Sequence, residues 1–164
     1  MGEVMGEQLA EVDALLLGRR TYEIFAAHWP HVDDADDPGA AKLNSMQKYV
    51  ASRSLDAVEW NNSTLLSGDV DEAVESLKEE PGGHILVQGS SDLIQTLLEH
   101  DLVDEFRLWV FPLVLGTGKR LFGDGTVPAN LRLTDAETST TGVQMLRYEP
   151  AAEIDFGSFT LEEA

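Results

Sequence analysis

The segment DALLLG at residues 13–18 constrains the fold more than any other stretch of the chain. Its apolar residues follow one another without alternation, which is typical of a strand in the middle of an α/β sheet rather than of one with a face in water. A helical pattern follows from about Arg20 to His28 and stops before Trp29-Pro30, because a residue preceding proline resists helical geometry. A buried strand leading into a helix is the repeating unit of α/β domains.

Further strands and helices alternate along the chain. Period-two and period-3.6 patterns predict strands at 47–52, 63–68, 84–88 and 104–116, and helices at 4–12, 39–46, 70–80 and 91–100. Alternating residues at 131–139 and 142–150 predict an antiparallel hairpin around Thr140-Thr141-Gly142. We therefore expect one three-layer α/β/α domain over 1–150, with a mixed, mostly parallel sheet that ends in the hairpin. Residues 151–164 are expected to be a tail or an edge strand.

Composition excludes several classes of function. The 164 residues carry 30 acidic and 11 basic side chains, a net charge of −19, which argues against binding to nucleic acid or to anionic membranes. There is no cysteine, so disulfides and thiolate chemistry are excluded. The longest apolar stretch, 108–116, is too short to span a bilayer, and the N-terminus lacks a signal-peptide pattern, so we expect a cytoplasmic protein. The acidity fits either a saline cytosol or a mesophilic protein kept soluble by its charge.

Three predicted strands end in residues suited to holding an anion. The ends read Gly18-Arg19-Arg20-Thr21, Ser52-Arg53-Ser54 and Gly89-Ser90-Ser91. The first and third pair a glycine with a helix start, where free amide groups and the helix dipole favour negative charge. Each end alone could be an ordinary strand end and helix cap. Together they gather three of the seven arginines at one predicted sheet edge, which favours an anion site.

Four segments carry a resemblance to a known family. In order, DALLLGRRTYE, VASRS, HILVQGSSDLIQTLL and FPLVLGTGKRLF resemble the dihydrofolate reductase-like family, over about residues 12–150. The resemblance is closest to the branch related to the C-terminal reductase domain of the bifunctional riboflavin-biosynthesis deaminase/reductase. It implies a dihydrofolate reductase-like fold that binds NADPH along the carboxyl edge of its sheet.

The same resemblance assigns roles to individual residues. It implies that the first strand end grips the cofactor's phosphates, the second lies by the adenosine 2′-phosphate, and the third touches the pyrophosphate. It also implies that a segment after the long strand lies near the nicotinamide end. The residues concerned are Gly18, Arg19, Arg20 and Thr21; Ser52, Arg53 and Ser54; Gly89, Ser90 and Ser91; and Leu115, Gly116 and Gly118.

Other residues are open to more than one interpretation. Trp29 either walls a substrate pocket or packs in the core. His28 and His31 precede several aspartates, but their spacing matches no strong metal motif and a solvated acidic loop is favoured, so no metal is expected. No catalytic proton donor can be identified.

The chain departs from the family at its start. Such proteins begin with an extra strand, whereas here Met1 opens in the first predicted helix. This implies a truncated chain, a replacement strand such as 153–161, or a rebuilt sheet. Two hypotheses follow: an NADPH-dependent reductase of a small pterin-like or ribosylaminopyrimidine-like substrate, or a homodimer of the same fold without turnover. A homodimer is expected in either case, through a sheet edge at 104–116 or 131–150.

Overall fold

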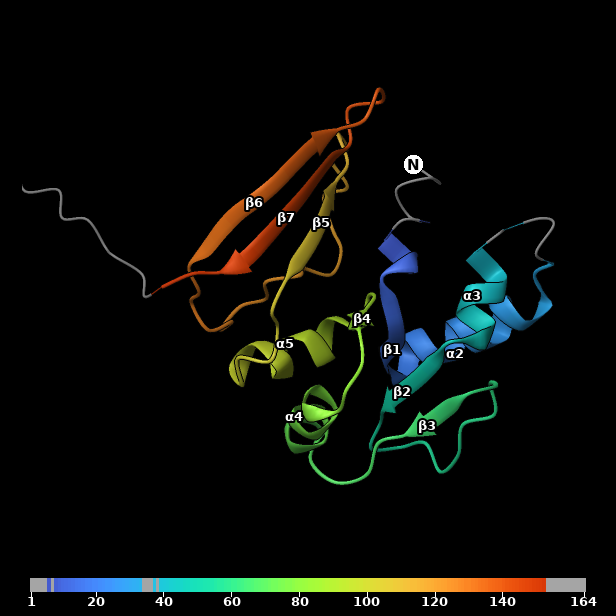
Figure 1. Ribbon diagram of the computed structural model, residues 1–164. Helices are drawn as coiled ribbons and strands as arrows, with labels where there is room; N and C mark the ends of the chain where they lie inside the picture. The colour runs from blue at the N-terminus through green and yellow to red at the C-terminus, as the bar shows by residue number, and fades with distance from the viewer. Residues whose placement is uncertain (1–5, 7, 34–36, 38, 153–164) are drawn as a thin grey trace, which may run out of the picture. The chain divides into compact units, whose positions relative to one another are not determined.

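The computed structural model describes residues 6, 8–33, 37 and 39–152 (Figure 1). They form two compact units, Met1–Leu102 with Lys119–Asp124 as unit 1, and Val103–Gly118 with Gly125–Ala164 as unit 2. In chain order the elements are β1 (Val12–Gly18), α2 (Arg19–His28), the 3-10 helix η1 (Trp29–His31), α3 (Gly39–Ser45), β2 (Gln47–Ala51), β3 (Ser63–Leu65), α4 (Val70–Glu79), β4 (His84–Val87), α5 (Ser91–Glu99), β5 (Phe106–Val110), β6 (Leu131–Thr138) and β7 (Gln144–Pro150).

Unit 1 is built on a four-stranded parallel sheet in the order β3-β2-β1-β4. The central strand is β1, whose Leu15, Leu16 and Leu17 are almost completely buried, as the apolar run predicts. Because all four strands are parallel, β1, β2 and β4 point their carboxyl ends to the same edge, with Gly18 opposite Ala51 in the register. In open α/β sheets, ligands bind outside this edge.

Helices cover the two faces of the unit 1 sheet. Figure 1 shows α2 and α3 on one side of β1 and β2, and α4 and α5 on the other. On the α2 side, one cluster of apolar and aromatic side chains forms the core; it contains Val12, Leu15, Leu17, Tyr22, Leu43, Met46, Val50 and Trp60. On α5, Leu93 and Leu97 are buried.

One charged side chain, Lys48 of β2, is completely buried in this unit. Its Nζ donates to the backbone oxygens of Asn44, Met46 and Asn61, at 3.0, 2.6 and 2.9 Å. The ammonium also lies 4.3 Å from the centre of the Trp60 ring, a cation–π distance. Burial lowers the pKa of Lys48 to about 8, so the amine is still charged at pH 7. The lysine therefore ties the end of α3 and the segment before β3 to β2.

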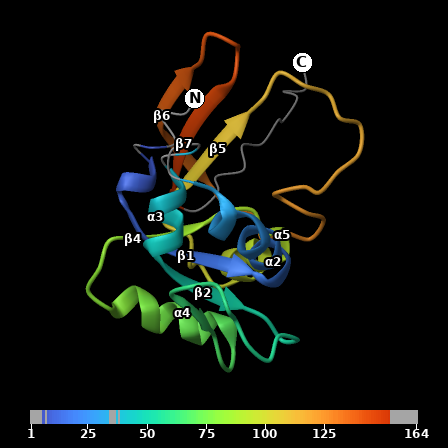
Figure 2. The ribbon, with the colours of Figure 1, turned by 90° about the vertical axis from the view of Figure 1, so that its right-hand side faces the viewer.

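Unit 2 is a three-stranded antiparallel sheet in the order β5-β7-β6. Figure 2 shows these strands side by side, with β6 and β7 joined by the tight turn. In that turn Ser139 N donates to Val143 O, and Gly142 N donates to Ser139 O. The predicted hairpin is thus confirmed.

The fold class is confirmed, and three details differ from the sequence prediction. The parallel and antiparallel strands form separate sheets among the described residues, because no described strand pairs with the free edges of β4 and β5. The prediction of one long strand at 104–116 is wrong, since β5 ends at Val110. Pro112 has no N–H to donate, and Leu113 N turns back to Phe111 O at 2.8 Å. The predicted third strand, 63–68, is also shorter, because β3 ends at Leu65.

Two expectations fall outside what is described. The suggested replacement strand at 153–161 lies outside the described residues. So do residues 4, 5 and 7 of the predicted helix at 4–12. Among the helices that are described, none has the length and apolar character needed to cross a bilayer.

Candidate functional site at the carboxyl edge of the parallel sheet

The turns after β1 and β4 are joined by a chain of hydroxyl contacts. Gly18 N donates to Ser90 Oγ at 2.9 Å, and Ser90 Oγ donates to Thr21 Oγ1 at 3.0 Å. A Cβ on Gly18 would come within 3.4 Å of the Ser90 side chain. Two of the three predicted strand ends, 72 residues apart in sequence, are thus held in direct contact.

The turn after β4 requires its glycine. Gly89 has φ +66°, in the left-handed region, and a Cβ there would lie 3.3 Å from Thr21 Oγ1. Ser90 follows with φ 59° and ψ 48°, and α5 begins at Ser91. A left-handed residue followed by a helical one directs successive N–H groups into one concavity, an arrangement that binds anions.

Both helix starts at this edge present backbone amides. Within the described residues, α2 and α5 have no side-chain hydrogen bond that caps their first turns. The first N–H groups of a helix have no partner inside the helix, and they sit at the positive end of its dipole. The turns joined through Ser90 therefore offer two sets of amide donors to a negatively charged ligand.

The third strand end, after β2, is followed by a loop and not by a helix. Ser52 Oγ accepts hydrogen bonds from Ser54 N and Leu55 N, at 3.2 and 3.1 Å, so this hydroxyl shapes its own loop. Arg53 and Ser54 are exposed. Further along, Tyr22 Oη of α2 accepts from the backbone N–H groups of Glu59 and Trp60, at 2.8 and 3.0 Å. The loop after β2 is therefore tied to the helix that starts at the first strand end.

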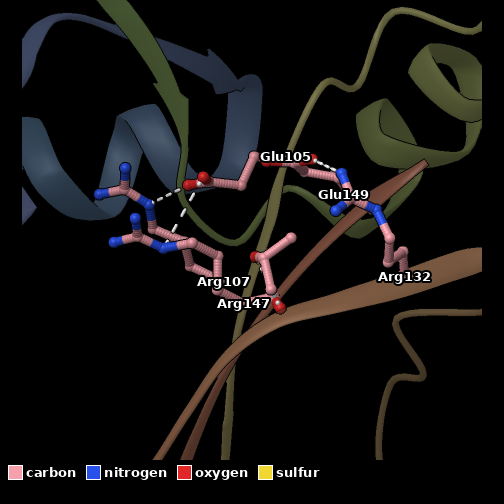
Figure 3. A network of polar contacts seen from close by, with 6 residues as sticks. Glu105, Arg107, Arg132, Arg147 and Glu149 are labelled. Carbon is pink, nitrogen blue, oxygen red and sulfur yellow. Dashed lines mark hydrogen bonds and ion pairs between the residues drawn. The ribbon is translucent and has the colours of Figure 1, made fainter. Parts of the chain in front are cut away.

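The arginines divide clearly by their partners. In unit 2, Glu105 binds both Arg107 and Arg147, and Arg132 pairs with Glu149 at 2.6 Å (Figure 3). In unit 1, Arg19 pairs with Glu23 at 3.1 Å and Arg120 with Asp124 at 3.7 Å.

The remaining two, Arg20 and Arg53, have no acidic partner among the described residues and are exposed. Both belong to the carboxyl edge of the parallel sheet. The arginines that lack an acidic partner among the described residues therefore lie at the predicted edge.

The residues predicted near the substrate or the nicotinamide lie apart from the turns described above in their contacts. Trp29 packs against the core cluster, with its ring near those of Phe25 and His28 at centroid distances of 6.2 and 5.1 Å. Leu115, Gly116 and Gly118 belong to unit 2, and Leu115 is largely exposed. No three His, Asp or Glu side chains of the described part gather closely enough to hold a metal ion.

Sequence reasoning missed some of the residues that build this edge. The hydroxyl contact between Ser90 and Thr21 joins residues 69 apart and leaves no local pattern. The tie made by Tyr22 is also long-range, although a buried tyrosine hydroxyl generally needs a partner. Gln95 of α5 was missed as well; its Nε2 donates to Leu121 O at 2.7 Å.

Comparison with known proteins gives one consistent family. The family model described as "RibD C-terminal domain" matches residues 1–146. The chain is 35% identical over 142 residues to the "Uncharacterized protein YyaP" of Bacillus subtilis, which covers 85% of this chain and 75% of that protein. It is 29% identical over 137 residues to YwjB of the same organism, covering 82% and 72%.

Solved structures agree in fold. A putative riboflavin biosynthesis protein from Shewanella sp. PV-4 matches with a TM-score of 0.69 and 22% identity, over 88% of this chain and 77% of the other. A diaminohydroxyphosphoribosylaminopyrimidine deaminase/5-amino-6-(5-phosphoribosylamino)uracil reductase from Thermotoga maritima matches with a TM-score of 0.59 and 18% identity, over 88% and 47%. These neighbours share the dihydrofolate reductase-like fold, so the fold expected from the sequence is confirmed.

Proposed function

The chain belongs to the RibD C-terminal domain family, and on that premise we propose that it is a reductase that transfers a hydride from NADPH to a small heterocyclic substrate. The substrate class that fits the family best is pterin-like or ribosylaminopyrimidine-like. The family supports a reductase of the riboflavin-pathway type.

The observation that carries the proposal is the position of the two arginines that have no acidic partner among the described residues. Arg20 and Arg53 lie at an edge that also presents two uncapped helix starts, in a chain with a net charge of −19. A dinucleotide phosphate such as NADPH carries a pyrophosphate and a separate 2′-phosphate. Backbone amides at helix starts suit the first, and a free guanidinium suits the second.

Hydride transfer asks little of the protein beyond position. The nicotinamide supplies the hydride when the cofactor is bound, and the protein must hold it against the acceptor carbon. In this chain the link among Gly18, Thr21 and Ser90 would set the phosphates relative to the sheet. Arg53, on the loop that Ser52 shapes, would then contact the 2′-phosphate.

Titration with NADPH and NADH tests the proposal. Binding can be followed by energy transfer from tryptophan to the nicotinamide. We expect NADPH to bind more tightly than NADH, and Arg53→Gln to weaken NADPH by about tenfold while leaving NADH nearly unchanged. Arg20→Gln should weaken both cofactors, because in the proposed complex Arg20 would contact the phosphates that they share.

Arg132→Gln in unit 2 is the matched control, since it removes the same charge from an arginine that is already paired. It should leave both affinities unchanged. If the wild-type chain binds neither cofactor, the proposal is wrong. Turnover is checked separately, by loss of nicotinamide absorbance when dihydrofolate or a ribosylaminopyrimidine is added.

A further inference from the structure

The segment Lys119–Asp124, here called the strap, belongs to unit 1 although the residues on both sides of it belong to unit 2. Gly118 before it and Gly125 after it have positive φ angles, 154° and 84°. In the middle of the strap, Leu121 and Gly123 are half-buried, while Lys119 and Arg120 are exposed. The strap is therefore docked at its centre and basic at its exposed start.

One side chain joins the strap to α5. Gln95 Nε2 donates to Leu121 O at 2.7 Å and lies 3.4 Å from Ser91 O in the first turn of the same helix. A single amide nitrogen thus bridges the strap and the start of α5. That start is the strand end after β4, which forms part of the edge described above.

The strand end after β4 is short of positive charge. The first strand end has Arg20 and the second has Arg53, but Gly89-Ser90-Ser91 has no basic residue and is followed by Asp92 in the first turn of α5. Lys119 and Arg120 lie in the strap, just before Leu121, whose carbonyl oxygen binds Gln95 of this helix. Arg120 pairs with Asp124, whereas Lys119 has no acidic partner among the described residues.

We propose that Gln95 is a positioning residue for the phosphate groups of the cofactor. It fixes the strap against the first turn of α5, so that Lys119 supplies the charge that this strand end lacks. The inference rests on the proposed function for the identity of the ligand, but its chemistry is that of a pyrophosphate group. Inorganic pyrophosphate therefore tests it independently of the nicotinamide.

The first measurement is tryptic cleavage after Lys119 and Arg120. In the wild type, saturating pyrophosphate or NADPH should slow this cleavage. Gln95→Met keeps the length of the side chain and removes the donor, so it should speed cleavage without ligand and reduce the protection at a given ligand concentration. Gln144→Met, the same change on the exposed side chain of β7, should do neither.

The second measurement is affinity. Gln95→Met and Lys119→Gln should each weaken pyrophosphate and NADPH by about three- to tenfold. Lys119→Gln should also reduce the salt dependence of binding. Lys42→Gln on α3 removes the same charge far along the chain from the strap and should change neither quantity.

The outcomes separate the two ideas. If NADPH binds but the strap is cut equally fast with and without it, the inference is wrong and the proposed function stands. If pyrophosphate protects the strap but NADPH does not bind, the proposed function is wrong and the inference stands. Unchanged affinities in Gln95→Met and Lys119→Gln would overturn the inference even if cleavage changes.

Discussion

Lys48 shows what a single residue does for this fold. It shares one face of β2 with Val50, and both are completely buried. The period of two in a strand could have indicated this from the sequence, because residues two apart point the same way. What the sequence could not indicate is the set of three carbonyl oxygens that receive the ammonium.

The lysine makes stability depend on pH. Burial lowers its pKa from 10.5 to about 8, so between these values the unfolded chain binds more protons than the folded one. The free energy of unfolding should therefore gain up to about 3 kcal/mol from this group as pH rises from 8 to 10.5, and nothing below pH 8. Chemical denaturation of the wild type and of Lys48→Met across this range measures the difference.

In Lys48→Met the free energy of unfolding should not rise between pH 8 and 10.5. At pH 7 this variant should be less stable than the wild type by about 1–3 kcal/mol, because the three carbonyl oxygens lose their donor. Lys42→Met on α3, outside the core, is the control and should keep the wild-type slope. Equal slopes in the wild type and in Lys48→Met would contradict the argument.

Between elements, the decisive contact is the one that joins the turns after β1 and β4. The left-handed Gly89 lets the second turn approach Thr21, and Ser90 then bonds to Gly18 and Thr21. The position of α5 relative to α2 depends on this approach. Because Gly18 and Ser90 directly precede α2 and α5, this contact brings the two helix starts together.

Gly89→Ala should therefore lower the stability of the protein and weaken ligand binding at the carboxyl edge of the parallel sheet. The left-handed conformation costs a non-glycine residue about 1–2 kcal/mol, and the new Cβ would press on Thr21 Oγ1 at 3.3 Å. We expect a loss of that size in the free energy of unfolding, measured by urea denaturation, together with weaker NADPH binding. Gly82→Ala, where nothing lies within 4 Å of the added Cβ, should cost far less. Equal effects would show that the turn does not need glycine.

At the scale of the whole molecule, the net charge of −19 is the dominant property. Repulsion among like charges destabilises a compact chain, and salt screens it: the Debye length falls from about 30 Å at 0.01 M to about 3 Å at 1 M. We expect the thermal unfolding midpoint to rise with chloride concentration. Replacing the exposed Glu75 and Glu79 of α4 by glutamine removes two charges and should reduce the gain. A midpoint that does not rise in multimolar salt would rule out adaptation to a saline cytosol.

The sequence by itself determined the order and type of the elements. The uniformly apolar β1, the amphipathic helices α4 and α5, and the β6–β7 hairpin follow from local periodicity, which the structure preserves. The strand ends could be named for the same reason, since glycine and the start of a helix are local signals. The prediction of a strand at 104–116 was wrong because the apolar residues continue past Pro112, where the backbone hydrogen bonds of the strand are interrupted.

Only the tertiary structure decided which of those residues meet. The link from Gly18 through Ser90 to Thr21 and the tie from Gln95 to the strap join residues that are distant in the sequence. The structure also shows which arginines are paired: five have an acidic partner, whereas Arg20 and Arg53 have none among the described residues. Some of these partners are close in the chain, as in Arg19 with Glu23, and others are about 70 residues apart. Periodicity reports which face a residue occupies, but a contact between faces depends on how the elements pack.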